Sequence, residues 1–176
     1  MRQIVISAVG PDRPGLVDQF SGELLERGAN IADSRMVNLR GQFALIVLIE
    51  ISDEQAEALL SQIAAAGEKI GLTVSATPLA GAAASAEGLP YQLKVYAMDQ
   101  PGIVHRVTHL LHGFGANVED LQTHLEPAAH SGTPLFTMQM KMTVPPSVHV
   151  KKLRRELEDL CDSLNCDIDL QPGQVD

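Results

Sequence analysis

Aromatic residues are scarce in this sequence: Phe, Trp and Tyr make up 3% of its 176 residues, and Trp is absent. Apolar residues nevertheless account for 45% of the chain, which is enough to bury a core in one medium domain or two small ones. We therefore expect aliphatic cores, packed from Leu, Ile, Val, Ala and Met.

Cysteine and long apolar runs are scarce as well. The only two cysteines, Cys161 and Cys166, cannot form a disulfide framework, and their spacing without a neighbouring His does not match a zinc site. The longest apolar run, residues 43–49, has the length of a strand rather than of a membrane span, and the first residues lack the apolar stretch of a signal peptide. We expect a cytoplasmic protein without a membrane partner, whose cysteines serve in packing.

Basic residues are outnumbered, with 13 Lys and Arg against 22 Asp and Glu and a formal net charge of −9. An acidic chain is repelled by nucleic acid and by anionic membranes. The one dense basic run, residues 151–155, is followed at once by acidic residues, which is typical of a solvated helix face. The charge balance therefore argues against a direct nucleic-acid partner.

Catalytic signatures are missing too, since the chain has no G-x-S-x-G, P-loop, H-E-x-x-H or G-x-G-x-x-G pattern. Three histidines, His105, His109 and His112, have a spacing that could place them on one stripe of a helix. The apolar residues between them occupy the inner face, so we expect this stripe to point outward. We predict no catalytic residues, no metal site and no cofactor.

A short motif, in contrast, occurs twice: residues 10–17 read GPDRPGLV and residues 97–104 read AMDQPGIV. Each copy follows a strand-like apolar run and opens a segment with helical spacing, with Pro14 suited to the first helical position. Unpaired N–H groups at the start of a helix form a place to bind a carboxylate. The alternative is a structural turn in which Asp12 and Asp99 cap the helix.

The motif belongs to a direct repeat at an offset of about 87 residues. Identical residues recur in the turn and again where the helix ends. The pairs are Asp12 with Asp99, Pro14 with Pro101, Gly15 with Gly102, Val17 with Val104, Leu24 with Leu111, Gly28 with Gly115, Ala29 with Ala116, Asn30 with Asn117, and Asp33 with Asp120.

Each half follows the order strand, helix, strand, strand, helix, strand. The expected strands are 2–9, 30–39, 43–51, 72–77, 91–97, 117–125, 134–144 and 166–170; the expected helices are 15–27, one capped by Ser52, 102–114, and one starting at 145–147. A stretch rich in Ala, Gly and Ser separates the halves. We predict a first domain at 1–79, a linker at 80–88 and a second domain at 89–176.

This order predicts an α+β fold of two ferredoxin-like βαββαβ domains, each an antiparallel sheet with two helices on one face. The other face is left bare. Residues 43–51 are apolar at almost every position, so we expect that face to be covered by the sister domain, by a second chain or by both. The sequence therefore predicts close packing of the domains and a homodimer.

The D-R-P-G-L-V turn after a short strand, the helix end G-A-N-I and the βαββαβ order resemble the ACT domain family, and the resemblance covers both halves. It implies an amino-acid effector, glycine or a related compound, bound at a domain–domain interface. The resemblance implies that N–H groups of the turn bind the carboxylate of this amino acid and that an Asp binds its ammonium. It also implies that residues of the second strand contact the ligand. The implied residues are Asp12, Gly15, Leu16, Val17, Asn30 and Ile31 in the first copy, and Asp99, Gly102, Ile103, Val104, Asn117 and Val118 in the second.

The same resemblance implies a regulatory protein rather than an enzyme, since enzymes with an ACT domain carry a separate catalytic domain. It suggests a transcriptional regulator that acts through a protein partner such as a transcriptional activator. The alternative is a regulatory subunit that controls a metabolic enzyme in trans.

The acidic balance generates a first prediction: the purified protein alone does not bind DNA at physiological salt, because neutralising phosphates requires a basic face. An electrophoretic mobility-shift titration checks this. A retarded band whose affinity falls steeply with salt, as several phosphate contacts require, would contradict it.

Overall fold

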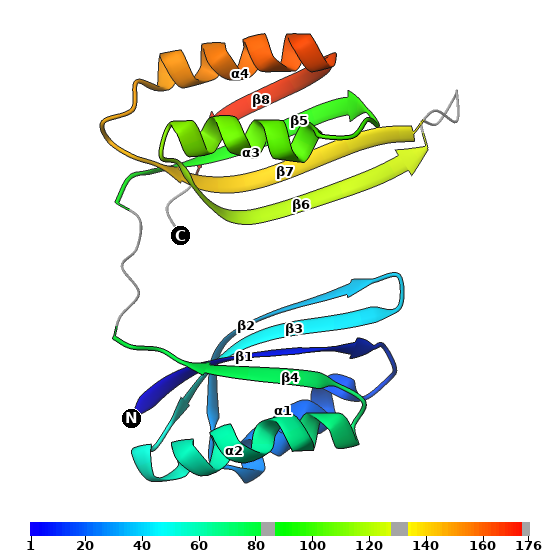
Figure 1. The fold of residues 1–176 in the computed structure, drawn as a ribbon, viewed down its shortest axis with the longest axis vertical. Helices are drawn as coiled ribbons and strands as arrows, with labels where there is room; N and C mark the ends of the chain where they lie inside the picture. The colour runs from blue at the N-terminus through cyan, green and yellow to red at the C-terminus, as the bar shows by residue number, and fades with distance from the viewer. Residues whose placement is uncertain (82–86, 128–133, 174–176) are drawn as a thin grey trace. The chain divides into compact units, whose positions relative to one another are not determined.

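The computed structural model describes residues 1–81, 87–127 and 134–173, and the chain divides into two compact units, Met1–Ala83 and Ala84–Asp176 (Figure 1). This division falls within the segment 80–88, of which residues 82–86 lie outside the described part of the chain. The first unit consists of β1 (Arg2–Pro11), α1 (Leu16–Glu26), β2 (Asn30–Leu39), β3 (Gln42–Ile51), α2 (Asp53–Lys69) and β4 (Thr73–Pro78).

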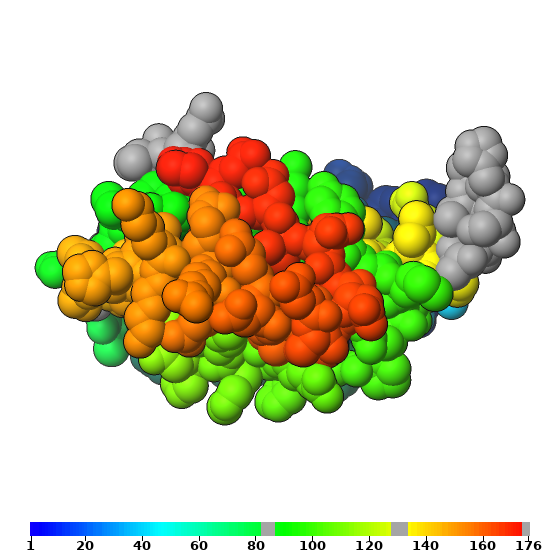
Figure 2. Space-filling view, turned by 90° about the horizontal axis from the view of Figure 1, so that it is seen from above, coloured from blue at the N-terminus to red at the C-terminus, as the bar shows by residue number. Residues whose placement is uncertain are grey.

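The second unit repeats this order. Its elements are β5 (Leu89–Met98), α3 (Ile103–Gly113), β6 (Asn117–Pro127), β7 (Pro134–Val144), α4 (Val150–Leu164) and β8 (Cys166–Pro172). Figure 2 views this unit from its helix-covered side, where atoms of α4 and α3 overlie the sheet.

The two sheets have the same strand order, β2-β3-β1-β4 and β6-β7-β5-β8, and the neighbouring strands are antiparallel. In each unit both helices lie on one face of the sheet (Figure 1). The predicted α+β class with two ferredoxin-like domains is therefore confirmed.

Local signals account for several element ends. Gly28, with φ 76°, and Gly115, with φ 70°, follow α1 and α3 in the left-handed conformation that ends a helix. The Ser52 hydroxyl accepts a hydrogen bond from the N–H of Gln55 (3.3 Å) and caps α2 as predicted. Arg40 and Gly41 both have positive φ, 49° and 79°, which fits a two-residue hairpin between β2 and β3.

The expected start of the last helix at 145–147 is wrong, since α4 begins at Val150. Pro145 and Pro146 have no N–H to donate, and the N–H of Val148 donates instead to the Pro145 carbonyl (3.0 Å). This bond closes a turn ahead of the helix.

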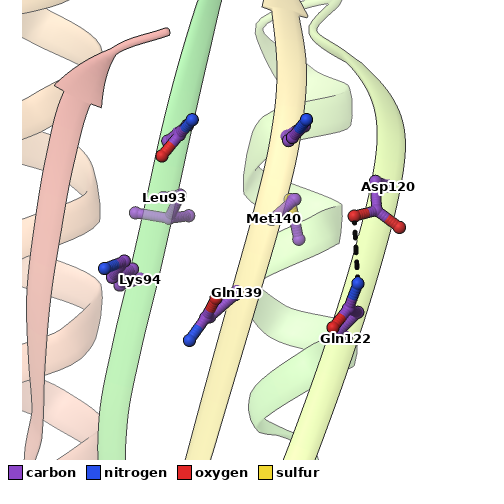
Figure 3. A pocket seen from close by; sticks show the side chains of 8 residues that line it. Leu93, Lys94, Asp120, Gln122, Gln139 and Met140 are labelled. Carbon is purple, nitrogen blue, oxygen red and sulfur yellow. Dashed lines mark hydrogen bonds between the residues drawn. The ribbon is translucent and has the colours of Figure 1, made fainter.

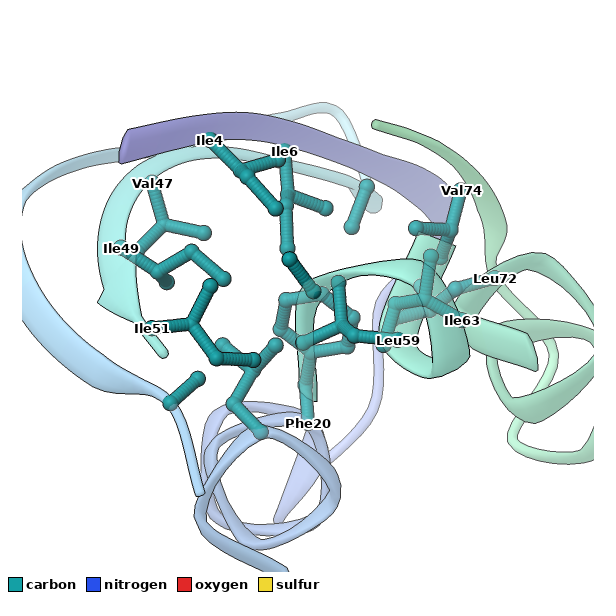
Figure 4. Close-up of a cluster of buried hydrophobic side chains, with 14 of the residues drawn as sticks. Ile4, Ile6, Phe20, Val47, Ile49, Ile51, Leu59, Ile63, Leu72 and Val74 are labelled. Carbon is teal, nitrogen blue, oxygen red and sulfur yellow. The ribbon is translucent and has the colours of Figure 1, made fainter. Parts of the chain in front are cut away.

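The core of the first unit is aliphatic apart from two phenylalanines (Figure 4). Alternate residues of β1 and β3, among them Ile4, Ile6, Val47 and Ile49, point at the helices, and Phe20 of α1 fills the space beneath them. Because β3 alternates in this way, the helices cover only one of its faces. Ile46, on the opposite face, remains 50% exposed, so the expected cover on both faces is not supplied by the helices of this unit.

The core of the second unit relies on methionine, with Met138, Met140 and Met142 buried along β7. Methionine adapts to irregular space, which suits a core poor in aromatic residues. Cys161 and Cys166 are buried in the same cluster, in agreement with the predicted packing role.

The histidine stripe of α3 points to solvent, as predicted, with the His105 and His109 rings 5.8 Å apart. The described residues contain no group of three or more His, Cys, Asp or Glu placed to share a metal ion. His130 lies outside them. None of the helices described is long and apolar enough to cross a membrane.

Burial generates a prediction for the thiols: Cys161 and Cys166, 2% and 8% exposed, resist iodoacetamide at pH 8 in the native protein. Burial raises the pKa of Cys161 to about 12 and also raises the pKa of Cys166, so little thiolate is present. Mass spectrometry after labelling should find both thiols modified only in denaturant. The raised pKa values also imply that the free energy of unfolding falls above pH 9, where the thiols ionise in the unfolded chain but not in the folded protein. Rapid labelling of Cys161 in the native protein would contradict the prediction that this thiol is buried and protonated.

Candidate functional site

The turn between β1 and α1 begins the helix without a side-chain cap. Gly15 occupies the N-cap position in the left-handed conformation, with φ 87° and ψ 2°, and its carbonyl accepts the first helical hydrogen bond from the N–H of Gln19 (2.9 Å). Pro14 therefore precedes the helix rather than opening it. The N–H groups of Leu16 and Val17, at the first helical positions, have no partner within the helix.

Asp12 does not cap the helix, contrary to the structural alternative considered for this turn. Its backbone N–H donates to the carbonyl of Gly41 (2.8 Å), and its Oδ2 accepts a hydrogen bond from the Asn38 side-chain amide. Asn38 Oδ1 in turn accepts from the N–H of Gly41 (3.2 Å). The β2–β3 hairpin thus orients the Asp12 carboxylate, and Oδ1 has no hydrogen-bond partner in the described parts of the chain.

Arg13 connects the same turn to α1 and to the end of α2 through hydrogen bonds. Its guanidinium donates to the side-chain carbonyl of Gln19 in α1 (2.6 Å) and to the backbone carbonyl of Ile70 at the end of α2 (3.0 Å). In the second unit Gln100 replaces Arg13, and its side-chain amide donates to the carbonyl of Leu164, the last residue of α4. The link to the second helix is kept although the residue type changes.

A depression of about 470 Å³ lies at the turn of the first unit, within the size range of small-molecule sites. Its lining combines apolar and charged residues: Asp12, Arg13, Gly15, Leu16, Val17, Asp18, Met36 and Phe43. Side chains of both charges and apolar side chains therefore line the same depression. An amino-acid zwitterion requires this combination, because its carboxylate needs donors or a cation and its ammonium needs an acceptor.

The turn of the second unit has the same backbone but different surroundings. Gly102 has φ 97°, and the N–H of Asp99 donates to the carbonyl of Pro134 (3.2 Å), as Asp12 does to Gly41. Leu125 occupies the position of Asn38, opposite Phe136 in the strand pairing, so no amide orients Asp99 from there. The two predicted sites thus share Asp and Gly but not the group that fixes the carboxylate.

The predicted residues of the second strand do not lie beside the turn of their own unit. Asn30 pairs with Glu50 at one end of β2, whereas the hairpin that contacts Asp12 lies at the other. A ten-residue strand places these ends about 30 Å apart. The same holds for Asn117, which pairs with Thr143 at the start of β6. The first unit therefore brings together Asp12, Gly15, Leu16 and Val17, but not Asn30 and its neighbour Ile31. The second unit brings together Asp99, Gly102, Ile103 and Val104, but not Asn117 and its neighbour Val118.

A β-bulge follows those strand starts in both copies: Ala32 and Glu119 are each left out of the pairing register. Glu119 Oε1 accepts a hydrogen bond from the Thr143 hydroxyl. A bulge changes which face the following side chains point to, so Asp33 and Asp120 both lie on the face away from the helices.

Sequence reasoning missed Asn38, Met36 and Phe43 as neighbours of the turn. The signal was present in the hairpin, because a two-residue turn at Arg40 and Gly41 sets Asn38 opposite Phe43. Placing that pair beside Asp12 also requires the pairing of β1 with β3, in which Pro11 faces Gln42.

Comparison with known proteins agrees with this architecture. The sequence model of the ACT domain matches residues 2–77. The chain is 25% identical over 162 residues to the glycine cleavage system transcriptional repressor of Escherichia coli (strain K12), covering 92% of this chain and 85% of that one. It is 36% identical over 76 residues to a UPF0237 protein of Methanopyrus kandleri, covering 42% of this chain and 84% of that one. A crystal structure of an unknown protein from Galdieria sulphuraria is 31% identical with a TM-score of 0.85, covering 98% of this chain and 99% of that one.

The geometry of Gly15 generates a prediction on stability. A Cβ at Gly15 meets no atom within 4 Å, so Gly15→Ala adds only the strain of a left-handed Ala, about 1 kcal/mol of lost unfolding free energy. Gly22→Ala is the matched control, because it also meets open space but lies inside α1, where Ala gains up to about 1 kcal/mol. Urea unfolding followed by circular dichroism measures both. Equal stability of the two variants would show that the turn does not need glycine.

Proposed function

Because the chain belongs to the ACT domain family, we propose that it is a non-enzymatic cytoplasmic regulator that senses an amino acid and acts by binding another protein. The family model matches the first unit, and the internal repeat extends the assignment to the second. The observation that carries the sensing role is the depression at the first turn, with an uncapped helix start beside a carboxylate held by Asn38.

The effector binds as a zwitterion in this proposal. Its carboxylate accepts from the N–H groups of Leu16 and Val17, favoured by the positive end of α1, while its ammonium donates to the free oxygen of Asp12. Phe43 and Met36 supply apolar contact for its side chain. The binding step needs no cofactor or metal, and glycine or a related amino acid is the effector class we propose.

The regulated process is transcription in this proposal, supported by the likeness to the Escherichia coli repressor over 92% of the chain. The glycine cleavage system is the target we propose, because that protein is named for it. With a net charge of −9 the chain is unsuited to hold DNA itself, so it acts through a protein partner such as a transcriptional activator.

A thermal-shift screen of the full chain against the twenty common amino acids tests the sensing role. A ligand that binds only the folded state at a hundredfold excess over its Kd adds roughly 2.7 kcal/mol to the unfolding free energy, which raises Tm by several degrees. Asp12→Ala should abolish most of this shift by removing the partner of the ammonium group.

Asp99→Ala is the matched control, since the second turn has the same Asp and Gly without an amide at the Asn38 position. It should leave the shift unchanged. If no amino acid raises Tm, or if both variants respond like the parent, the turn is structural and the sensing role is wrong.

A further inference from the structure

One position beside the turn changes from polar to apolar between the two units. Asn38 lies opposite Phe43 in the pairing of β2 with β3. Leu125 lies opposite Phe136 in the pairing of β6 with β7, so it occupies the same place in the second unit. The Asn38 amide donates to the Asp12 carboxylate, whereas a leucine side chain can neither donate nor accept a hydrogen bond. Leu125 is 54% exposed, so the core of the second unit does not require an apolar residue there.

The orientation of the Asn38 side chain is fixed because both of its polar atoms have partners. Its Oδ1 accepts from the N–H of Gly41 (3.2 Å), and its Nδ2 donates to Asp12 Oδ2. The Asp12 carboxylate is thereby held in one orientation, with its other oxygen left to accept from a ligand. A ligand at Asp99 would have to immobilise the carboxylate itself, since no amide lies at the position of Asn38. Immobilising a side chain costs binding free energy.

The other parts of the turn are common to both units. Gly15 and Gly102 start their helices in the left-handed conformation, with φ 87° and 97°. The backbone N–H groups of Asp12 and Asp99 both donate to a carbonyl beside the start of the facing strand, β3 or β7. The next residue links each turn to the end of the second helix of its unit. These shared contacts hold the turn in both units, so the side chain at position 38 or 125 decides whether the carboxylate is oriented.

We propose, on the basis of the sensing role above, that Asn38 is the positioning residue of the effector site and that Leu125 at the same place leaves the second turn without a site. Asn38 need not contact the effector. It acts through Asp12, because its amide holds the carboxylate with one oxygen available to the ammonium group. The chain therefore binds one effector molecule, at the first unit, although the motif occurs twice.

The amide of Gln122 in β6 cannot take the place of Asn38. Gln122 lies three residues before Leu125, and its amide donates to Asp120 (3.4 Å) beside a depression of about 160 Å³ (Figure 3). Successive residues of a strand point to opposite faces of the sheet, so Gln122 and Leu125 lie on opposite faces. An amide at position 125, in contrast, would lie where Asn38 lies in the first unit.

Isothermal titration calorimetry on the full chain tests the proposal, with glycine and with every other common amino acid that raises the Tm of the parent. The parent should bind one molecule per chain. Asn38→Leu should bind roughly tenfold more weakly or not at all, because Asp12 loses the group that orients it. The double variant Asn38→Leu, Leu125→Asn should regain binding of one molecule per chain, and Asp99→Ala in that background should abolish it. Each introduced residue type occurs at the same place in the other unit, so the fold accommodates both changes. A purely structural role of Asn38 would not move the site to Asp99.

The double variant Asn38→Leu, Gln122→Asn is the matched control, since it adds an asparagine to the same strand on the other face, and it should bind no better than Asn38→Leu. Circular dichroism checks that each variant is folded. Full binding by Asn38→Leu alongside loss of binding in Asp12→Ala would overturn the positioning role and leave the sensing role intact. A parent that binds two molecules per chain, or a double variant with Leu125→Asn that regains no binding, would also overturn the proposal. A parent that binds no amino acid would overturn the sensing role and the proposal together.

Discussion

The fixation of the β1–α1 turn by groups outside the helix is the constraint from which the rest of this structure follows. A left-handed glycine starts α1 without a side-chain cap, and the turn is held instead by the hairpin carbonyl of Gly41 and by the carbonyl of Ile70 at the end of α2. Because other groups hold the turn, the first N–H groups of the helix are left for a ligand. The bond from Arg13 to Ile70 also connects the start of α1 to the end of α2.

Periodicity was sufficient to predict the fold, since the spacing of Leu16, Phe20 and Leu24 identifies a helix and the repeat confirms each element in a second copy. Rules for single residues were less successful. The prolines at 145 and 146 suggest a helix start and Asp12 suggests a cap, yet Pro145 and Asp12 accept other hydrogen bonds. The partner of Asp12 is Asn38, 26 residues away, which no local rule identifies.

The candidate site was predictable only in the part that is contiguous in sequence. Residues of one turn stay together in any fold, so Asp12 and Gly15 lie together as expected. The family resemblance assigns Asn30 to the same ligand, whereas the antiparallel register places it at the far end of β2 from the hairpin that holds Asp12. Met36 and Phe43 enter the site for the converse reason, because the register brings them to the turn.

The duplication separates what the fold requires from what has been free to change. Left-handed glycine at the turn, the bond from residue 13 or 100 to the end of the second helix, and the bulge in the edge strand occur in both units. The amide that orients the Asp carboxylate and the apolar sheet face occur only in the first. Two copies with the same backbone have the same requirements for folding, so the features that occur in only one copy are not explained by folding. The amide lies beside the depression at the turn, whereas the apolar residues Val5, Ile46 and Leu48 lie on the sheet face that points away from the helices.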